Sequence, residues 1–468
     1  MDVSSKSFNA QEQYYERLKL FFLSASFFCV IGSYSVIKEI KNTVFLKLVG
    51  VDHIPLARVC VMFALIPLIF LYSKLVDKLR RHHLLSVCAG FFAVAGLVFA
   101  YFLGHPTIGI PNTNVQSDRW FAWFFYFFVE GYSPFVVSVF WSFANSINSP
   151  ESARHTYGTM VSWSKLGGIV ATGFAIVFLK LHATGQNQLG VDLFNHQVLL
   201  VGSSLLLLVT IPVLYYMIRV IPGRYLHGYE AVYVVEKEKD RKHSSDTTIF
   251  SGIRMLILYP YVFGIFAMSF FYEVITVVLS YLVVSMSQAY GTMTASLEYL
   301  LGVILVTHTI GVCISYFGTR TLFNKLGTRR CLLLIPASSG IVLCYYLISS
   351  SPATALAFTF VILRAINYAF SWPLRESLYI PTVKEIKFKS KSWIDVFGSK
   401  FAKTTGSGFN VAARKVAPAL FMPLHTVFFA GIVGVWFLAA YLLGRRFDKA
   451  VAHNEVIGAA NEHGHDKA

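Results

Sequence analysis

Apolar runs long enough to cross a membrane recur along the whole chain. Because a bilayer core offers no water to backbone groups, a spanning segment must be helical or part of a closed barrel, and about 20 apolar helical residues cover its ~30 Å. The sequence predicts twelve such helices, at residues 18–37, 55–76, 84–104, 119–148, 156–181, 197–219, 255–284, 297–318, 331–350, 352–374, 396–420 and 424–444. With 55% hydrophobic and 14% charged residues, the composition favours an all-α membrane protein.

The long hydrophilic loop in the middle of the chain predicts two halves of six helices each. Its centre reads VEKEKDRKHSSD, a run of mixed charge that is typical of a linker. We therefore expect an N-terminal half at 1–221, a cytoplasmic linker at 222–254, a C-terminal half at 255–446 and a cytoplasmic tail at 447–468.

Short motifs repeat between the two halves. The basic loop Val76–Arg81 is echoed by Phe323–Arg330, and Ser164–Gly168 is echoed by Ala402–Gly406, about half a chain later. Internal duplication of this kind is common in secondary transporters. The two basic loops also resemble, in degraded form, the D-x-x-G-R-R loop of the major facilitator superfamily, so we expect a major-facilitator-like fold.

The net charge of +16 is explained by topology rather than by a nucleic-acid partner. Lys and Arg collect in alternate loops, 24 on one side against about six on the other. By the positive-inside rule the first set is cytoplasmic, together with both termini. The first residues carry Asp2, Glu12 and Glu16, unlike a cleaved signal peptide, so the sequence predicts insertion into a cell inner membrane.

Ionisable residues inside the apolar runs are the main functional signal. A charge at the bilayer centre costs roughly 2.5–3.5 kcal/mol, so it normally faces a polar path. In a fold of this type, spans 1, 4, 7 and 10 line a central cavity, with spans 5 and 11 beside them. The charges in these spans are Lys38, Lys41, Glu130, Lys165, Glu273, Arg364 and Lys403. Five basic groups against two deep carboxylates suit a substrate carrying two or three phosphates.

Each of these residues has an alternative interpretation. Lys38 and Glu39 could lie at the membrane surface, with the lysine reaching toward water. Lys41 lies deeper only if the first helix continues through 43–46, which its apolar sequence supports. Glu130 and Glu273 could instead form purely structural ion pairs.

Further positions near the predicted cavity suggest gating and base recognition. Arg375 and Glu376, at the end of span 10, could cap a cytoplasmic gate. Aromatic rings such as Tyr34, Trp141 and Tyr272 could stack on a planar base.

Motifs for ATP hydrolysis and for metal or dinucleotide binding do not occur. The sequence has no G-x-x-x-x-G-K-[ST], no H-E-x-x-H and no G-x-G-x-x-G. We expect no enzyme activity, cofactor or metal, so transport would be driven by gradients or by exchange. A membrane enzyme acting on a phospholipid or polyprenyl phosphate would need a recurring set of His, Asp or Ser residues near one interface, and His82 and His83 lie in a loop without such a set. A receptor would not explain the duplicated lysines.

The charged residues of the spans and the motifs around them resemble, in their order along the chain, those of the nucleotide transporters of intracellular bacteria and plastids, the ATP/ADP translocase family. The matching motifs span both halves and are Tyr34–Phe45, Glu130, Phe140–Asn145, Pro150–Arg154, Glu273, Arg375–Glu376, Phe388–Asp395 and Lys403–Gly406. The resemblance implies a nucleotide transporter that works by alternating access in the lipid bilayer, and we expect it to be a monomer. ATP/ADP exchange is the first expectation; proton-coupled import of other nucleotides or of NAD is the alternative.

The resemblance also implies roles for individual residues. Lys41 and Lys403 would bind phosphate, while Glu130 and Glu273 would tune exchange by contacting the base, by gating or by taking up a proton. The full set of substrate-binding candidates is Lys41, Lys403, Glu130, Glu273, Lys38, Lys165, Asn145 and Arg364. The gating candidates are Arg375, Glu376 and Asp395. Departures from the family pattern, among them Lys38, Asn42 and Ala402, leave the exact nucleotide open.

Overall fold

The structure, a computed structural model, is mostly helical in the part of the chain that it describes. That part comprises residues 3–79, 81–148, 150–183, 185, 187–226, 250–314, 319–349, 351–379, 381–383, 386, 390–453 and 455–458. Apart from one bridge between Thr382 and Ile457, these residues form helices and their connections. The all-α prediction is confirmed.

The chain packs into two compact units. Unit 1 contains residues 1–244 and 284–309, and unit 2 contains residues 245–283 and 310–468. Most of the predicted linker, at 227–249, and the end of the tail, at 459–468, lie outside the described residues. The predicted boundaries between halves, linker and tail remain a prediction.

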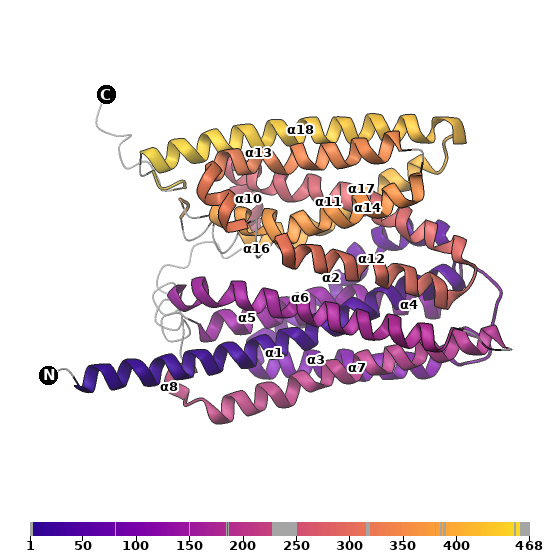
Figure 1. Cartoon of the computed structure of the whole chain (residues 1–468), viewed down its shortest axis with the longest axis horizontal. Helices are drawn as coiled ribbons and strands as arrows, with labels where there is room; N and C mark the ends of the chain where they lie inside the picture. Colours follow the sequence, from indigo (N-terminus) through magenta and orange to yellow (C-terminus); the bar gives the residue numbers. More distant parts are fainter. Residues whose placement is uncertain are drawn as a thin grey trace. The chain divides into compact units, whose positions relative to one another are not determined.

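Unit 1 is built around its first helix, which packs along α6 and α7 (Figure 1). Its helices are α1 Val3–Leu48, η1 Val51–His53, α2 Ile54–Lys78, α3 Arg81–Leu103, α4 Trp120–Tyr132, η2 Ser133–Val137, α5 Ser138–Ile147, α6 Pro150–Leu181, α7 Gln188–Val220 and α8 Gly223–Leu226. The unit also holds η3 Gln288–Tyr290 and most of α12 Met293–Cys313. Because α1 continues to Leu48, Lys41 lies well inside the helix, as the apolar run after it predicted.

Unit 2 contains the remaining helices. They are α10 Phe250–Leu258, α11 Pro260–Ser287 up to residue 283, α13 Thr319–Ile348, α14 Pro352–Ile366, η5 Asn367–Ser371, α15 Trp372–Ser377, α16 Lys391–Trp393, η7 Ile394–Gly398, α17 Ser399–Ala413 and α18 Pro418–Ala452. Gly327, with φ 73°, interrupts α13 near its start, and beyond it α13 packs along α18 (Figure 1).

Among the described residues, nine helices are long and apolar enough to cross a membrane. Three of the twelve predicted spans are not among them. Span 55–76 corresponds to α2, span 352–374 begins with the shorter apolar helix α14, and span 396–420 covers part of η7, all of α17 and the start of α18. The chain is therefore a multi-pass membrane protein, while the count of twelve remains a prediction.

Close helix contact in unit 1 depends on glycine at the crossing of α1 and α6. A Cβ atom on Gly167 would lie 2.3 Å from the carbonyl oxygen of Phe28, and one on Gly32 would lie 3.0 Å from the carbonyl oxygen of Gly167. Small residues at such crossings let two backbones approach within a membrane. This contact fixes α1, and therefore Lys41, against α6.

The helices that carry Glu130 and Arg364 each contain or run into a π-helical turn at a matching place. The turn η2 begins three residues after Glu130, and η5 begins three residues after Arg364. Proline lacks an N–H donor and so disturbs the α-helical hydrogen-bond ladder; Pro134 lies inside η2, and Pro373 follows η5 closely. Each turn thus lies beside one of the charges that the sequence singled out.

Candidate substrate site

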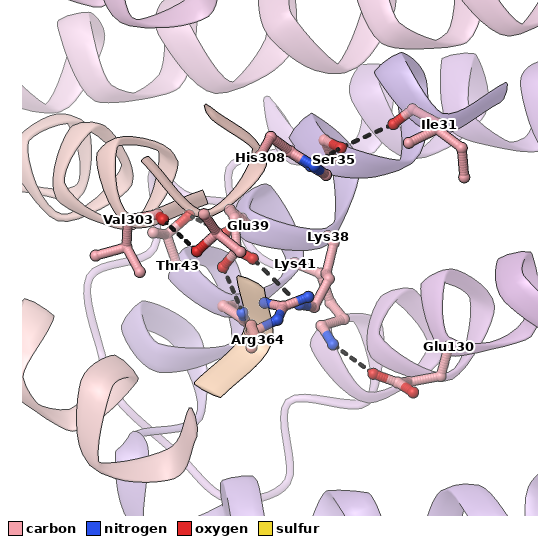
Figure 2. A network of polar contacts seen from close by, with 12 residues as sticks. Ile31, Ser35, Lys38, Glu39, Lys41, Thr43, Glu130, Val303, His308 and Arg364 are labelled. Carbon is pink, nitrogen blue, oxygen red and sulfur yellow. Dashed lines mark hydrogen bonds and ion pairs between the residues drawn. The ribbon is translucent and has the colours of Figure 1, made fainter. Parts of the chain in front are cut away.

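Lys41 and Glu130, which the sequence placed on two different helices, meet in the structure (Figure 2). The Lys41 ammonium of α1 donates to Oε1 of Glu130 in α4 at 2.6 Å, and the two side chains are 3% and 21% exposed. The ring centroid of Tyr126, one turn before Glu130, lies 4.1 Å from the same ammonium. A carboxylate and an aromatic face therefore hold one buried cation.

The neighbouring charges of α1 form a second polar group. Lys38 lies with its Nζ 3.5 Å from Oε1 of Glu39, and Asn42 donates from its side-chain amide to Oε2 of Glu39 at 2.8 Å. Glu39 is only 3% exposed, which does not fit a position at the water-facing surface. The amide oxygen of Asn42 is buried and accepts no hydrogen bond from the residues that the structure describes.

Two further candidates lie elsewhere in unit 1. Lys165 is buried in α6, 6% exposed, two residues before the close contact at Gly167. Asn145 of α5 is exposed, and its side-chain oxygen accepts a hydrogen bond from the hydroxyl of Tyr157 in α6. The part of both residues in a substrate site stays a prediction.

In unit 2 the corresponding charges are not paired in the same way. Lys403 of α17 and Glu273 of α11 are half-buried, and neither forms a hydrogen bond or ion pair with another residue of the described ranges. Arg364 of α14 donates to the Tyr368 hydroxyl at 3.0 Å, and its guanidinium lies 5.2 Å from the ring centroid of Phe360. Aromatic groups thus accompany this arginine.

The three predicted gating residues belong to one charged cluster with Lys391. Arg375 donates to the hydroxyl of Ser269 in α11, and Lys391 donates to Glu376 at 2.5 Å. Asp395, in η7, is attracted electrostatically by Arg375 and Lys391 and repelled by Glu376. The sequence marked Lys391 only as part of a motif, of which residues 388 and 389 lie outside the described ranges. A gating role for the cluster remains a prediction.

A buried network joining α7 to α12 and α1 was missed. The carboxylate of Asp192 accepts the backbone N–H of Thr294 at 2.9 Å and its hydroxyl at 2.6 Å, at the start of α12. Four residues later, His196 lies with Nε2 2.9 Å from the Thr43 hydroxyl of α1. The predicted helix begins at 197, after both residues, whereas α7 begins at Gln188.

The aromatic residues predicted to stack on a base mostly pack against other side chains. Tyr34 stacks on Tyr132 with centroids 5.1 Å apart, and Trp141 lies edge-on to Phe27 at 5.2 Å. Tyr272 is 7% exposed. Stacking of a base on any of them stays a prediction. Across the described ranges, no group of three or more His, Cys, Asp or Glu side chains could hold a metal ion.

Comparison with solved structures identifies the fold. A D-xylose–proton symporter matches with a TM-score of 0.61 at 13% identity, covering 93% of this chain and 98% of that one. A nucleoside transporter, NupG, matches with a TM-score of 0.54 at 12% identity, covering 93% and 99%. The xylose transporter XylE, described as a member of the major facilitator superfamily, matches with a TM-score of 0.59 at 15% identity, covering 93% and 96%. The chain thus has a major-facilitator-like fold, as predicted.

Comparison of the sequence identifies the family. ADP,ATP carrier protein 3 of Rickettsia felis is 22% identical over 442 residues, covering 84% of this chain and 86% of the carrier. ADP,ATP carrier protein 1 of Chlamydia pneumoniae is 22% identical over 476 residues, covering 90% of each. The family model for the TLC ATP/ADP transporters matches residues 8–337, which is more than half of the sequence. This chain belongs to the TLC ATP/ADP transporter family.

Proposed function

We propose that this protein is a secondary transporter that exchanges nucleotides, ATP for ADP in the first place, by alternating access. Family membership and the names of its Rickettsia and Chlamydia relatives support the substrate class. The single observation that carries the proposal is the Lys41 ammonium, 3% exposed and held between Glu130 and the ring of Tyr126. A buried cation kept beside a replaceable anion is what a phosphate site within a membrane requires.

The pair suggests how a nucleotide binds. A terminal phosphate carries more negative charge than a carboxylate and offers more acceptor oxygens, so it competes with Glu130 for the Lys41 ammonium. On binding, the phosphate takes the ammonium and Glu130 is released, and on departure Glu130 takes it back. Lys403 supplies a second positive charge to the phosphates from the C-terminal half.

The same chemistry favours exchange over one-way transport. When the nucleotide leaves, Lys41 regains its carboxylate, but Lys403 has no hydrogen-bond or ion-pair partner among the residues described. Moving an unneutralised ammonium through a state closed to water is costly. A nucleotide taken up from the opposite side removes that cost, so loaded carriers change conformation faster than empty ones.

Location and assembly complete the proposal. The loop charges favour an inner membrane with both termini in the cytoplasm. The protein acts as a monomer in the lipid bilayer, with substrate contacts drawn from Lys38, Lys165, Asn145, Arg364 and Glu273 besides the two lysines. It binds no nucleic acid and catalyses no reaction.

Exchange in proteoliposomes tests the proposal. Labelled ADP should enter vesicles preloaded with ATP at least tenfold faster than empty vesicles. Lys41→Ala and Lys403→Ala should abolish that uptake, while Lys180→Ala, at a position 66% exposed, serves as the matched loss of one positive charge. Full uptake by both site variants would remove the phosphate-ligand assignment. Competition by GTP, CTP, NAD and inorganic phosphate then defines the nucleotide.

Proton-coupled import of another nucleotide or of NAD is the second candidate. One observation favours it: the Glu273 carboxylate is half-buried and accepts no hydrogen bond from the described part of the chain, which leaves it available to bind a proton. Accumulation in empty vesicles that collapses with a protonophore, and that Glu273→Gln abolishes, would support import over exchange.

A further inference from the structure

An apolar groove of about 730 Å³ runs between α13 and α18 in unit 2. Its walls are small and aliphatic or aromatic side chains, among them Ala337, Gly340, Ile341, Val433, Gly434 and Phe437. A Cβ atom on Gly434 would meet nothing within 4 Å, so the groove is open at this point. Only 28% of the most apolar window of α18 is buried, the lowest share among the nine spans of the described residues. The groove therefore faces the hydrocarbon of the bilayer.

One end of this helix pair is basic. The guanidinium groups of Arg329 and Arg445 lie 5.4 Å and 5.7 Å from the ring centroid of Tyr441. Arg330 is exposed beside them. The stem of Arg329 crosses α18 at Gly444, where a Cβ atom would lie 2.8 Å from its Cγ.

Among the described residues, few carboxylates neutralise the positive charge of this arginine cluster. Asp448 lies 4.0 Å from Arg329, at the limit of an ion pair, and both side chains are about half exposed. The next arginine, Arg446, is engaged by Glu455 instead. Arg445 forms no ion pair with any residue that the structure describes, and it lies against the ring of Tyr441.

The groove and the basic cluster share one face of the helix pair. On α18, residues Phe437, Tyr441 and Arg445 follow at intervals of four, which places them along one stripe. From Pro418, about 20 residues of helix cover the hydrocarbon core, so the position of Arg445 falls at the level of the headgroups. An apolar groove that ends in a basic cluster at headgroup depth has the shape and charge of a site for one lipid molecule.

We propose that an anionic phospholipid of the surrounding bilayer occupies this groove, with an acyl chain between α13 and α18 and its phosphate on Arg329 and Arg445. Basic pockets between spanning helices recognise anionic headgroups in this manner. A zwitterionic lipid would supply the same chain but less net charge. A second copy of the protein would bring an identical arginine cluster to the same face, and the like charges would repel.

Lipid binding to the purified protein tests the proposal. Native mass spectrometry with phosphatidylglycerol and with phosphatidylcholine of the same acyl chains should show one tightly bound phosphatidylglycerol and weaker phosphatidylcholine. Arg445→Gln, at an exposed position that packing tolerates, should weaken phosphatidylglycerol binding about fivefold and leave phosphatidylcholine unchanged. Gly434→Leu should weaken both lipids because it fills the groove.

Matched variants make the readout specific. Gly431→Leu also adds a side chain to open space on α18, but Gly431 does not line the groove, and lipid binding should not change. Arg219→Gln removes one exposed arginine near the end of α7 and should likewise have no effect. Equal affinity for the two headgroups, or unchanged binding by Gly434→Leu, would overturn the proposal. A dimer that Gly434→Leu dissociates would assign the groove to a second copy instead.

Discussion

Lys41 and Lys403 are the same residue type with the same expected task, but their surroundings differ. Lys41 is 3% exposed, 2.6 Å from Glu130 and 4.1 Å from the ring centroid of Tyr126. Lys403 is half-buried and contacts neither a carboxylate nor an aromatic ring within the described residues. The N-terminal lysine is therefore held in an ion pair, whereas the C-terminal lysine has no such partner among the described residues.

Under the proposed function, this difference predicts that the two lysines contribute to nucleotide binding in different ways. A phosphate that reaches Lys403 gains its attraction directly, whereas one that reaches Lys41 must first displace Glu130. Lys403 would then bind the incoming nucleotide first, and Lys41 would bind it only in the final bound position. Variants that alter one lysine or its partner can break or sharpen this distinction.

The largest expected difference concerns the loss of each ammonium. Lys41→Ala leaves the Glu130 carboxylate without its cation, which should cost about 3 kcal/mol of stability, at the low end of the range for buried pairs because Glu130 is 21% exposed. Lys403→Ala should abolish transport with little effect on stability. Thermal unfolding of the two purified variants measures the contrast. Equal midpoints would mean that the Lys41 pair adds nothing to the fold.

Replacing each lysine by arginine should have the next largest effect, and the loss of exchange activity should differ between the two positions. The guanidinium is larger and planar, and Lys41 has almost no exposed surface around it, so Lys41→Arg should lose most exchange activity through overpacking. Lys403→Arg, at a half-buried position, should retain a substantial fraction. Initial rates of ADP uptake into ATP-loaded vesicles decide the matter. Similar activity in both variants would contradict the difference in packing.

Neutralising Glu130 should make the two lysines more alike. In Glu130→Gln the ammonium of Lys41 no longer has a competing anion, so nucleotide should bind about tenfold more tightly and exchange more slowly. Equilibrium binding and exchange rates measured on one preparation test both parts. Glu298→Gln is the control, because Glu298 lies 3.7 Å from Lys180, outside the proposed site, and the affinity of this variant for nucleotide should change little. Weaker binding by Glu130→Gln would argue that the carboxylate contacts the nucleotide.

The smallest effect is expected at Tyr126, whose ring lies beside the Lys41 ammonium. Tyr126→Leu removes the face that supports the Lys41 ammonium and should weaken nucleotide binding about fivefold, corresponding to ~1 kcal/mol. Tyr126→Phe keeps the ring and removes a buried hydroxyl that forms no hydrogen bond with the residues described, so it should bind normally. Binding titrations of both variants distinguish ring from hydroxyl. A loss in the phenylalanine variant would point to the hydroxyl.

Much of this fold and part of the site could be predicted because a membrane imposes strict costs. The lengths of the apolar runs predict most of the spans. Because burying a charge in a membrane is costly, Lys41 and Glu130 stand out as site candidates from the sequence alone. Their pairing was not predictable, because 89 residues separate them and spacing alone does not fix which helix faces meet.

The missed network shows where hydropathy fails. Asp192 and His196 are polar and precede the apolar run, so an average over the window excluded them from the helix. The side chain of Asn187 accepts the N–H of Gly190 at 3.1 Å, and this cap marks the true beginning of α7. Capping residues were therefore the better guide to this boundary than hydropathy.

The π-helical turns beside Glu130 and Arg364 have a consequence for how these helices tolerate change. Such a turn amounts to a single inserted residue, and one residue of α-helix corresponds to a rotation of about 100°. Because the turn absorbs that residue locally, deleting Phe135 from η2 would restore ordinary winding and leave the residues up to Ile147 facing as before. The same deletion in a regular stretch of the helix would turn every later side chain by that angle, so a one-codon deletion should be tolerated better at this point than elsewhere in the helix.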